Sequence, residues 1–105
     1  MIVNGFETET MGENVILEVD RYANNNRNAI SLIDKEDGLP FATLTVNIPD
    51  AFLNQGEFCV KDWQENEQVA KDMLKTGLFV DTGIRIPTGY AKAPVWCLAD
   101  GVTFF

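Results

Sequence analysis

The stretch from residue 14 to residue 48, NVILEVDRYANNNRNAISLIDKEDGLPFATLTVNI, decides the fold because it predicts three strands joined by two short turns. Apolar side chains at alternate positions, such as Val15 and Leu17, are typical of a strand with one buried face. The asparagine run 24–26 predicts a turn, because asparagine tolerates the left-handed backbone that tight turns need. A second turn is predicted at residues 37–40. The predicted meander consists of strands at residues 14–23, 28–34 and 41–48.

Further elements are predicted on both sides of this meander. They are a strand at 2–7, a turn around Met11 and Gly12, a short strand at 57–61, and a C-terminal hairpin of strands 78–86 and 90–99. The last of these strands contains Pro94, which cannot donate to a strand ladder. We therefore expect it to be bulged or to lie at a sheet edge.

One helix is predicted at about residues 63–76. Asp62 is followed three positions later by Glu65, which has the form of a capping box and predicts Asp62 as the N-cap. Gly77 is predicted to end the helix, because glycine readily adopts the left-handed backbone that follows a last helical turn. The apolar stripe between these ends, at helical spacing, consists of Val69, Ala70, Met73 and Leu74.

The order of these elements predicts a single domain, residues 1–105, of the α+β class. We expect a twisted antiparallel β-sheet, made of the meander and the C-terminal hairpin, packed against the single α-helix. The chain has 105 residues, of which 46% are hydrophobic and 23% are charged. This composition is ordinary for one globular domain with its own core.

Residue chemistry excludes several classes of enzyme and metal site. The chain has no histidine and one serine, which excludes histidine-based acid–base catalysis, Ser-His triads and zinc sites that contain histidine. Cys59 and Cys97 form no CxxC pair and are expected to be buried reduced thiols, with a disulfide as the alternative. Asp34, Glu36 and Asp37 lack the spacing of a calcium-binding loop, so we expect no metal and no cofactor.

The net charge excludes some partners. Sixteen acidic residues against eight basic ones give a formal charge of -8, and the basic residues are scattered along the chain. Such a domain repels the phosphates of nucleic acid and the surface of anionic membranes, so we expect neither as a direct partner. The N-terminus lacks the basic and apolar segments of a secretory signal, and no apolar run is long enough to span a membrane. These features predict a soluble, cytoplasmic protein.

The strongest functional signal is the distribution of acidic residues. Residues 1–20 contain no base and five carboxylates, which are Glu7, Glu9, Glu13, Glu18 and Asp20. Alternation places the two acids of the first strand on one face and those of the second strand on one face, so four carboxylates share a surface if these strands pair. Asp34, Glu36 and Asp37 extend the acidic set. We expect these residues to bind a basic groove built for nucleic acid, and solubility alone is the alternative.

Several runs of the chain carry a resemblance to a known family. They are RYANNNRNAI at 21–30, LPFATLTVNIPD at 39–50, VKD at 60–62, ENE at 65–67 and residues 74–77. Together they resemble a family of small acidic proteins of unknown function, carried by phages and conjugative elements of low-GC Gram-positive gut bacteria. The resemblance covers most of the chain, from residue 15 to residue 98. It implies an accessory gene of a mobile element and brings no catalytic residues.

Charge and resemblance together predict a non-enzymatic interaction protein. We expect an anti-CRISPR-type inhibitor whose acidic surface occupies the nucleic-acid channel of a host Cas nuclease. The alternative is a regulatory or accessory domain of the mobile element, such as a homodimer, that binds another protein through a sheet edge. An enzyme built on Glu65 and Asp72 is disfavoured, because helical spacing puts both side chains on the solvent side of the helix.

Overall fold

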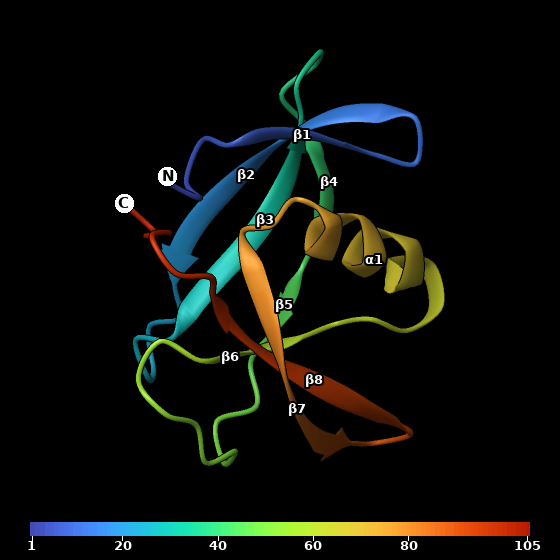
Figure 1. Cartoon of the computed structure of the whole chain (residues 1–105). Helices are drawn as coiled ribbons and strands as arrows, with labels where there is room; N and C mark the ends of the chain where they lie inside the picture. Colours follow the sequence, from blue (N-terminus) through green and yellow to red (C-terminus); the bar gives the residue numbers. More distant parts are fainter.

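The computed structural model describes all 105 residues, which form two four-stranded antiparallel sheets and a single α-helix (Figure 1). The elements are β1 (Glu7–Thr10), β2 (Glu13–Arg21), β3 (Asn28–Asp34), β4 (Pro40–Thr43), β5 (Thr45–Val46), β6 (Phe58–Val60), a 3-10 turn (Gln64–Asn66), α1 (Glu67–Lys75), β7 (Phe79–Thr88) and β8 (Ala91–Leu98). The first sheet has the strand order β1-β2-β3-β4 and the second has the order β5-β6-β8-β7. The predicted α+β class is confirmed.

The meander and the C-terminal hairpin belong to different sheets, because the strand predicted at 41–48 divides at Leu44. The backbone N–H of Leu44 donates to the carbonyl of Ile30 in β3 over 2.9 Å, and its own carbonyl accepts from the N–H of Lys61 over 2.8 Å. Leu44 is fully buried at this crossing point. The chain therefore leaves the first sheet as β4 and enters the second as β5.

The strand predicted at 2–7 is wrong, since β1 begins only at Glu7. The preceding residues lie beside the C-terminus instead: Ile2 bridges Thr103, and Val3 is fully buried (Figure 1). The predicted turn around Met11 and Gly12 is confirmed. Both residues have positive φ angles, 53° and 78°, which is the backbone of a two-residue hairpin turn.

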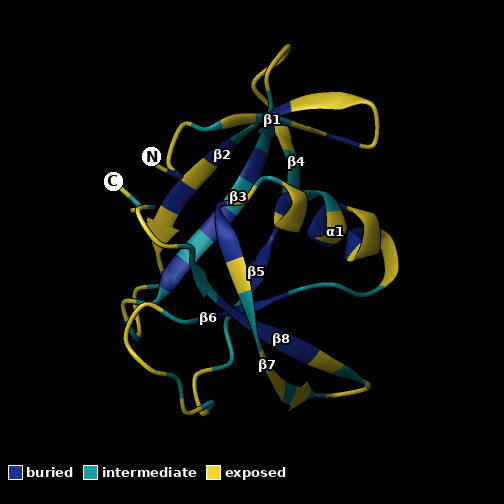
Figure 2. Cartoon of the chain, in the orientation of Figure 1, coloured by how far each residue is buried: buried dark blue, intermediate teal, exposed yellow.

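The core lies between the two sheets and beneath α1 (Figure 2). The first sheet contributes alternate residues such as Leu17 and Leu32, and the helix contributes Met73. In the second sheet, the rings of Phe58 and Phe79 meet edge to face with centroids 5.9 Å apart. The two sheets and the helix therefore share one hydrophobic core. The opposite face of the first sheet is turned toward solvent.

The start of the helix differs from the prediction. Asp62 is not the N-cap: a 3-10 turn covers Gln64–Asn66, and α1 starts at Glu67. Asn66 precedes α1, but its side-chain amide donates to the carbonyl of Thr43 over 2.6 Å instead of capping the helix. Gly77 follows the last turn with a φ of 78°, as predicted.

Pro94 lies in β8, which is not an edge strand because β6 and β7 flank it. β6 pairs with β8 only at Val95 and Trp96, so the ladder on that side ends before Pro94. The missing backbone N–H of Pro94 therefore costs no hydrogen bond to β6. The irregularity is on the partner strand, where β7 shifts register between Asp81 and Arg85. The prediction of an edge position was therefore wrong, and the bulge belongs to β7.

Candidate binding surface

Four predicted acidic residues lie on the outer face of the first sheet. Glu7 pairs with Ile16 and Glu9 pairs with Asn14, so the acids of β1 share a face with the even-numbered residues of β2. Glu18 and Asp20 belong to that set, while Val15, Leu17 and Val19 point into the core. We call the outer surface formed by Glu7, Glu9, Glu18 and Asp20 the acidic face.

An apolar pair borders the acidic face. Ile16 and Ile33 are cross-strand partners in β2 and β3, and both side chains are half-buried. A shallow hollow of about 200 Å³ opens beside them, lined also by Asn4, Gly5 and Glu18. Glu7 lies across from Ile16 and Glu18 follows it in β2, so the carboxylates lie on the β1 and β2 side of this apolar pair.

Little of the charge on the acidic face is neutralised within the chain. The ammonium group of Lys35 pairs with the Glu7 carboxylate at 2.8 Å, and both side chains are about half exposed. Exposed pairs of this kind contribute only about 0–1 kcal/mol to stability. Glu9 and Glu18 take part in none of the four ion pairs of the chain. Their carboxylates are therefore available to a partner.

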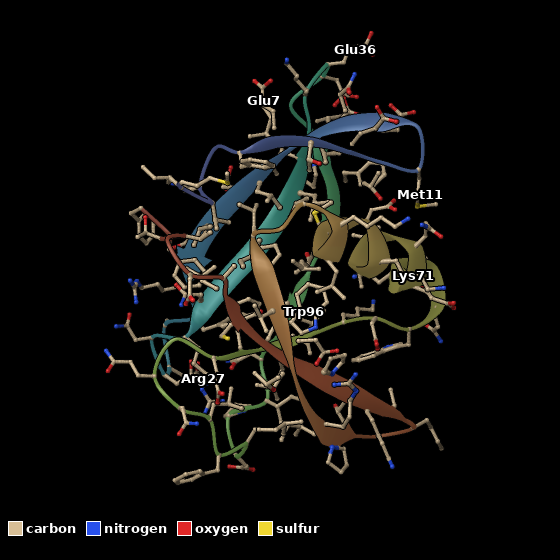
Figure 3. All side chains as sticks on the ribbon, viewed as in Figure 1. Glu7, Met11, Arg27, Glu36, Lys71 and Trp96 are labelled. Carbon is tan, nitrogen blue, oxygen red and sulfur yellow. The ribbon has the colours of Figure 1, made fainter.

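The other predicted acids lie at the tips of two hairpins of the first sheet, β1–β2 and β3–β4. Figure 3 labels Glu36 at the second of these tips. Glu13 pairs with Thr10 and is exposed at the end of β2. Asp34 accepts hydrogen bonds from the backbone N–H groups of Glu36 and Asp37, at 2.8 and 3.3 Å. A hollow of about 450 Å³ between the tips is lined by Gly12, Glu13, Asn14, Asp34, Lys35 and Glu36. The tips are thus adjacent to the acidic face without being part of it.

Asp37 and Asp34 have a local role that the sequence reasoning did not anticipate. Asp37 accepts a hydrogen bond from the backbone N–H of Leu39 over 2.9 Å, so both aspartates stabilise the turn between β3 and β4. Glu36 makes no such contact and points away from the tip (Figure 3). No group of three cysteine, aspartate or glutamate side chains is arranged to hold a metal ion.

The first hairpin is attached to the helix through the carboxylate of Asp72. The hydroxyl of Thr10, which is fully buried, donates to the Asp72 carboxylate over 2.8 Å. This bond and a second one from the Gln68 amide lower the pKa of Asp72 below its ordinary value. Glu65, which the sequence suggested as a partner for Asp72, instead pairs with Lys61 at 3.2 Å.

A charged cluster that the sequence analysis missed lies on the second sheet. The Arg85 guanidinium donates two hydrogen bonds of 2.9 Å to the Asp81 carboxylate across the bulge of β7, and this lowers the pKa of Asp81. Burial raises the pKa of the nearby Asp62 carboxyl, with Arg85 acting in the opposite direction. Only the bulge brings Asp81 and Arg85 together, and its one local sign in the sequence is Gly83, which lies within the bulge with a φ of 86°.

The two cysteines are free, as predicted. Cys59 is buried in β6, and burial raises the pKa of its thiol above the ordinary value. Cys97 is only half-buried, which differs from the prediction.

Comparison with protein-family models, with curated proteins and with solved structures finds no match to the chain. Neither helical segment has the length and hydropathy of a transmembrane helix.

Proposed function

We propose that the chain is a non-enzymatic inhibitor of the anti-CRISPR type, whose acidic face binds in a basic nucleic-acid channel of a host Cas effector. The observation that carries this proposal is the register of β1 against β2, which gathers Glu7, Glu9, Glu18 and Asp20 on one exposed surface. Carboxylates on a rigid sheet present a fixed pattern of negative charge, which is what a channel built for phosphates attracts.

The apolar pair beside the acidic face supports a protein partner over a simple cation. Apolar contacts that exclude water carry much of the binding energy at protein interfaces. Ile16 and Ile33 offer such a contact on the β3 side of the acidic face, and Glu7 and Glu18 lie next to Ile16. The complementary surface is therefore a basic one that also presents an apolar side chain.

An accessory domain of a mobile element that binds through a sheet edge is the second candidate. β7 is a ten-residue edge strand, but its bulge and Pro87 interrupt the row of groups that an added strand would need. β1 and β4 are free edges of only four residues each. These features favour the acidic face over an edge as the binding surface.

Charge reversal tests the proposal. We expect Glu18→Lys combined with Asp20→Lys to abolish binding to Cas effectors of candidate hosts, because placing like charges together costs several kcal/mol. Wild-type binding should also weaken as salt rises, since charges are screened over about 8 Å at physiological ionic strength. The measurement is the affinity of purified effectors for the immobilised chain, wild type and variant, at two salt concentrations.

The matched control reverses Glu65 and Glu67, which are exposed at the start of the helical segment and away from the acidic face. This control should bind like wild type. Equal binding by the strand reversal, or an affinity that does not change with salt, would contradict the acidic-face mechanism and favour the edge-binding alternative.

A further inference from the structure

The outer face of the second sheet carries a hydrophobic cluster of its own. Phe58 and Trp96 are cross-strand partners in β6 and β8, and both point into the main core. The next partners along these strands, Cys59 and Val95, therefore point to the opposite face. Together with Ala93 they are buried there against six half-buried apolar side chains, which are Val46, Ile48, Ala51, Leu53, Trp63 and Ile86. We call these nine residues the apolar face.

The apolar face carries no charge. None of its nine residues is acidic or basic, although the chain contains 16 acidic and 8 basic residues. Its six half-buried side chains leave part of this hydrocarbon surface in contact with water. Contiguous apolar surface that a folded chain exposes commonly marks an interaction site. The two sheets therefore present outer faces of opposite character, one acidic and the other neutral and apolar.

A projecting aromatic side chain lies beside the apolar face. Phe52 is 95% exposed, although Ala51 and Leu53 on either side of it pack against the cluster. The guanidinium of Arg27 fixes this loop by donating to the carbonyl of Ile48 over 2.8 Å and to that of Ala51 over 2.6 Å. Because the loop is already ordered, docking of Phe52 on a partner costs little conformational entropy.

A hollow that suits an aromatic ring lies at another edge of the apolar face. Its volume is about 320 Å³, and its lining consists of Trp63, Gln64, Thr88, Tyr90 and Ala91. Trp63 belongs to the apolar face, and Tyr90, in the turn between β7 and β8, is fully exposed. This turn and the loop that precedes β6 lie apart from each other at the lower end of the molecule in Figure 1. Because the lining has two aromatic rings and no charged group, a third ring packs favourably there.

The projection and the hollow are complementary, and each copy of the chain carries both. In a dimer with two-fold symmetry, a residue of one copy contacts a second residue of the other copy, and the reverse contact forms at the same time. Phe52 and the hollow can therefore meet twice in one interface, with the apolar faces of the two copies between the two contacts.

The charge of the chain favours a second copy as the partner on this face. Each copy has a net charge of -8, so two copies approach at the lowest electrostatic cost through surfaces that carry no charge. A basic partner is attracted to the acidic face of the other sheet instead, and an anionic membrane is repelled. We propose that the chain forms a symmetric dimer through its apolar face, in which Phe52 of each copy inserts into the hollow between Trp63 and Tyr90 of the other. This inference is independent of the acidic face, which the dimer leaves free.

The molecular mass in solution, measured over a wide range of concentrations, tests the proposal. We expect the mass from sedimentation equilibrium to rise from 11.7 kDa toward twice this value as the concentration increases. The dimer should not weaken as salt rises, because the contact is apolar and salt screens the repulsion between the two copies. A mass of 11.7 kDa at every concentration, or a dimer that dissociates as salt is added, would overturn the proposal.

Variants locate the interface. Phe52→Ala and Tyr90→Ala should each weaken the dimer by about tenfold or more, as the loss of a central aromatic contact does. Both side chains are exposed, so the melting temperature of the monomer should stay unchanged. The matched control is Leu39→Ala, which truncates another exposed apolar side chain, between β3 and β4, and should leave the dimer unchanged. A dimer that resists the first two substitutions, or that weakens equally in the control, would overturn the proposal.

Mixing the two variants tests whether Phe52 meets the hollow of the other copy. A dimer of one Phe52→Ala copy and one Tyr90→Ala copy keeps one of its two contacts intact, whereas a dimer of either variant alone has both contacts damaged. The mixture should therefore dimerise more tightly than either variant by itself. A mixture that is no tighter would overturn the pairing of Phe52 with the hollow.

Discussion

Carboxylates on the two sheets are in opposite situations. On the acidic face of the first sheet, Glu9 and Glu18 are exposed and have no cationic partner in the chain. On the second sheet, Asp81 is held by two hydrogen bonds from Arg85, and its pKa is lowered as a result. The same chemical group therefore stabilises the fold in one region and is left free in the other.

Only carboxylates without a partner inside the chain are available for binding. A carboxylate with a lowered pKa is more stable when ionised in the folded chain than in the unfolded chain, so its charge contributes to folding. An exposed carboxylate without a partner contributes little to stability, and its charge can be used by another molecule at little cost to the fold. The comparison predicts that stability and binding respond to substitutions on different sheets.

The largest stability effect is expected on the second sheet. Asp81→Ala should lower the free energy of unfolding by about 1 kcal/mol, because it removes a two-bond ion pair that is partly shielded from solvent. Glu18→Ala on the acidic face should change it by less than about 0.5 kcal/mol. Urea denaturation of both variants measures the difference. Equal losses would show that the two carboxylates are not in distinct situations.

The contact between Thr10 and Asp72 should give a smaller, pH-dependent effect. Because the pKa of Asp72 is lowered in the folded chain, its contribution is fully present above the ordinary aspartate pKa and is lost as the pH falls through the lowered value. Asp72→Asn should therefore lower the melting temperature at pH 7 and have little effect in strongly acidic solution. Thermal melts across this pH range provide the measurement. A melting-temperature difference that persists at low pH would mean that the Asp72 charge is not its cause.

Asp62 should give the smallest effect, with the opposite sign. Burial raises its pKa, so ionisation is harder in the folded chain than in the unfolded one and destabilises the fold as the pH rises through the raised value. Asp62→Asn should therefore raise the melting temperature slightly at pH 7 and leave it unchanged well below pH 4. A clear loss of stability at pH 7 would instead indicate a capping role, as the sequence predicted.

Much of the fold follows from local patterns in the chain. The alternation in β2, the turn at Met11 and Gly12, the apolar stripe of α1 and the glycine after it were all predicted, because each depends on neighbours within a few residues. The shared face of Glu18 and Asp20 follows from the same alternation. The sequence alone thus determined the α+β class and the grouping of acids on each strand.

Tertiary structure decided the features that depend on distant segments. Alternation runs through Leu44 without a break, and only its hydrogen bonds to Ile30 and Lys61 divide the chain between two sheets. Asp62 has the local pattern of a cap, yet a 3-10 turn at Gln64–Asn66 precedes α1, and the Asn66 side chain bonds to the distant carbonyl of Thr43.

The junction between the β2–β3 loop and the loop that precedes β6 is the clearest such case. It joins two loops whose link, from Arg27 to Ile48 and Ala51, spans more than twenty residues. A repeating pattern reports which side of a strand or helix faces the core. It carries no information about which loops the completed sheets bring together, because that depends on the packing of the whole chain.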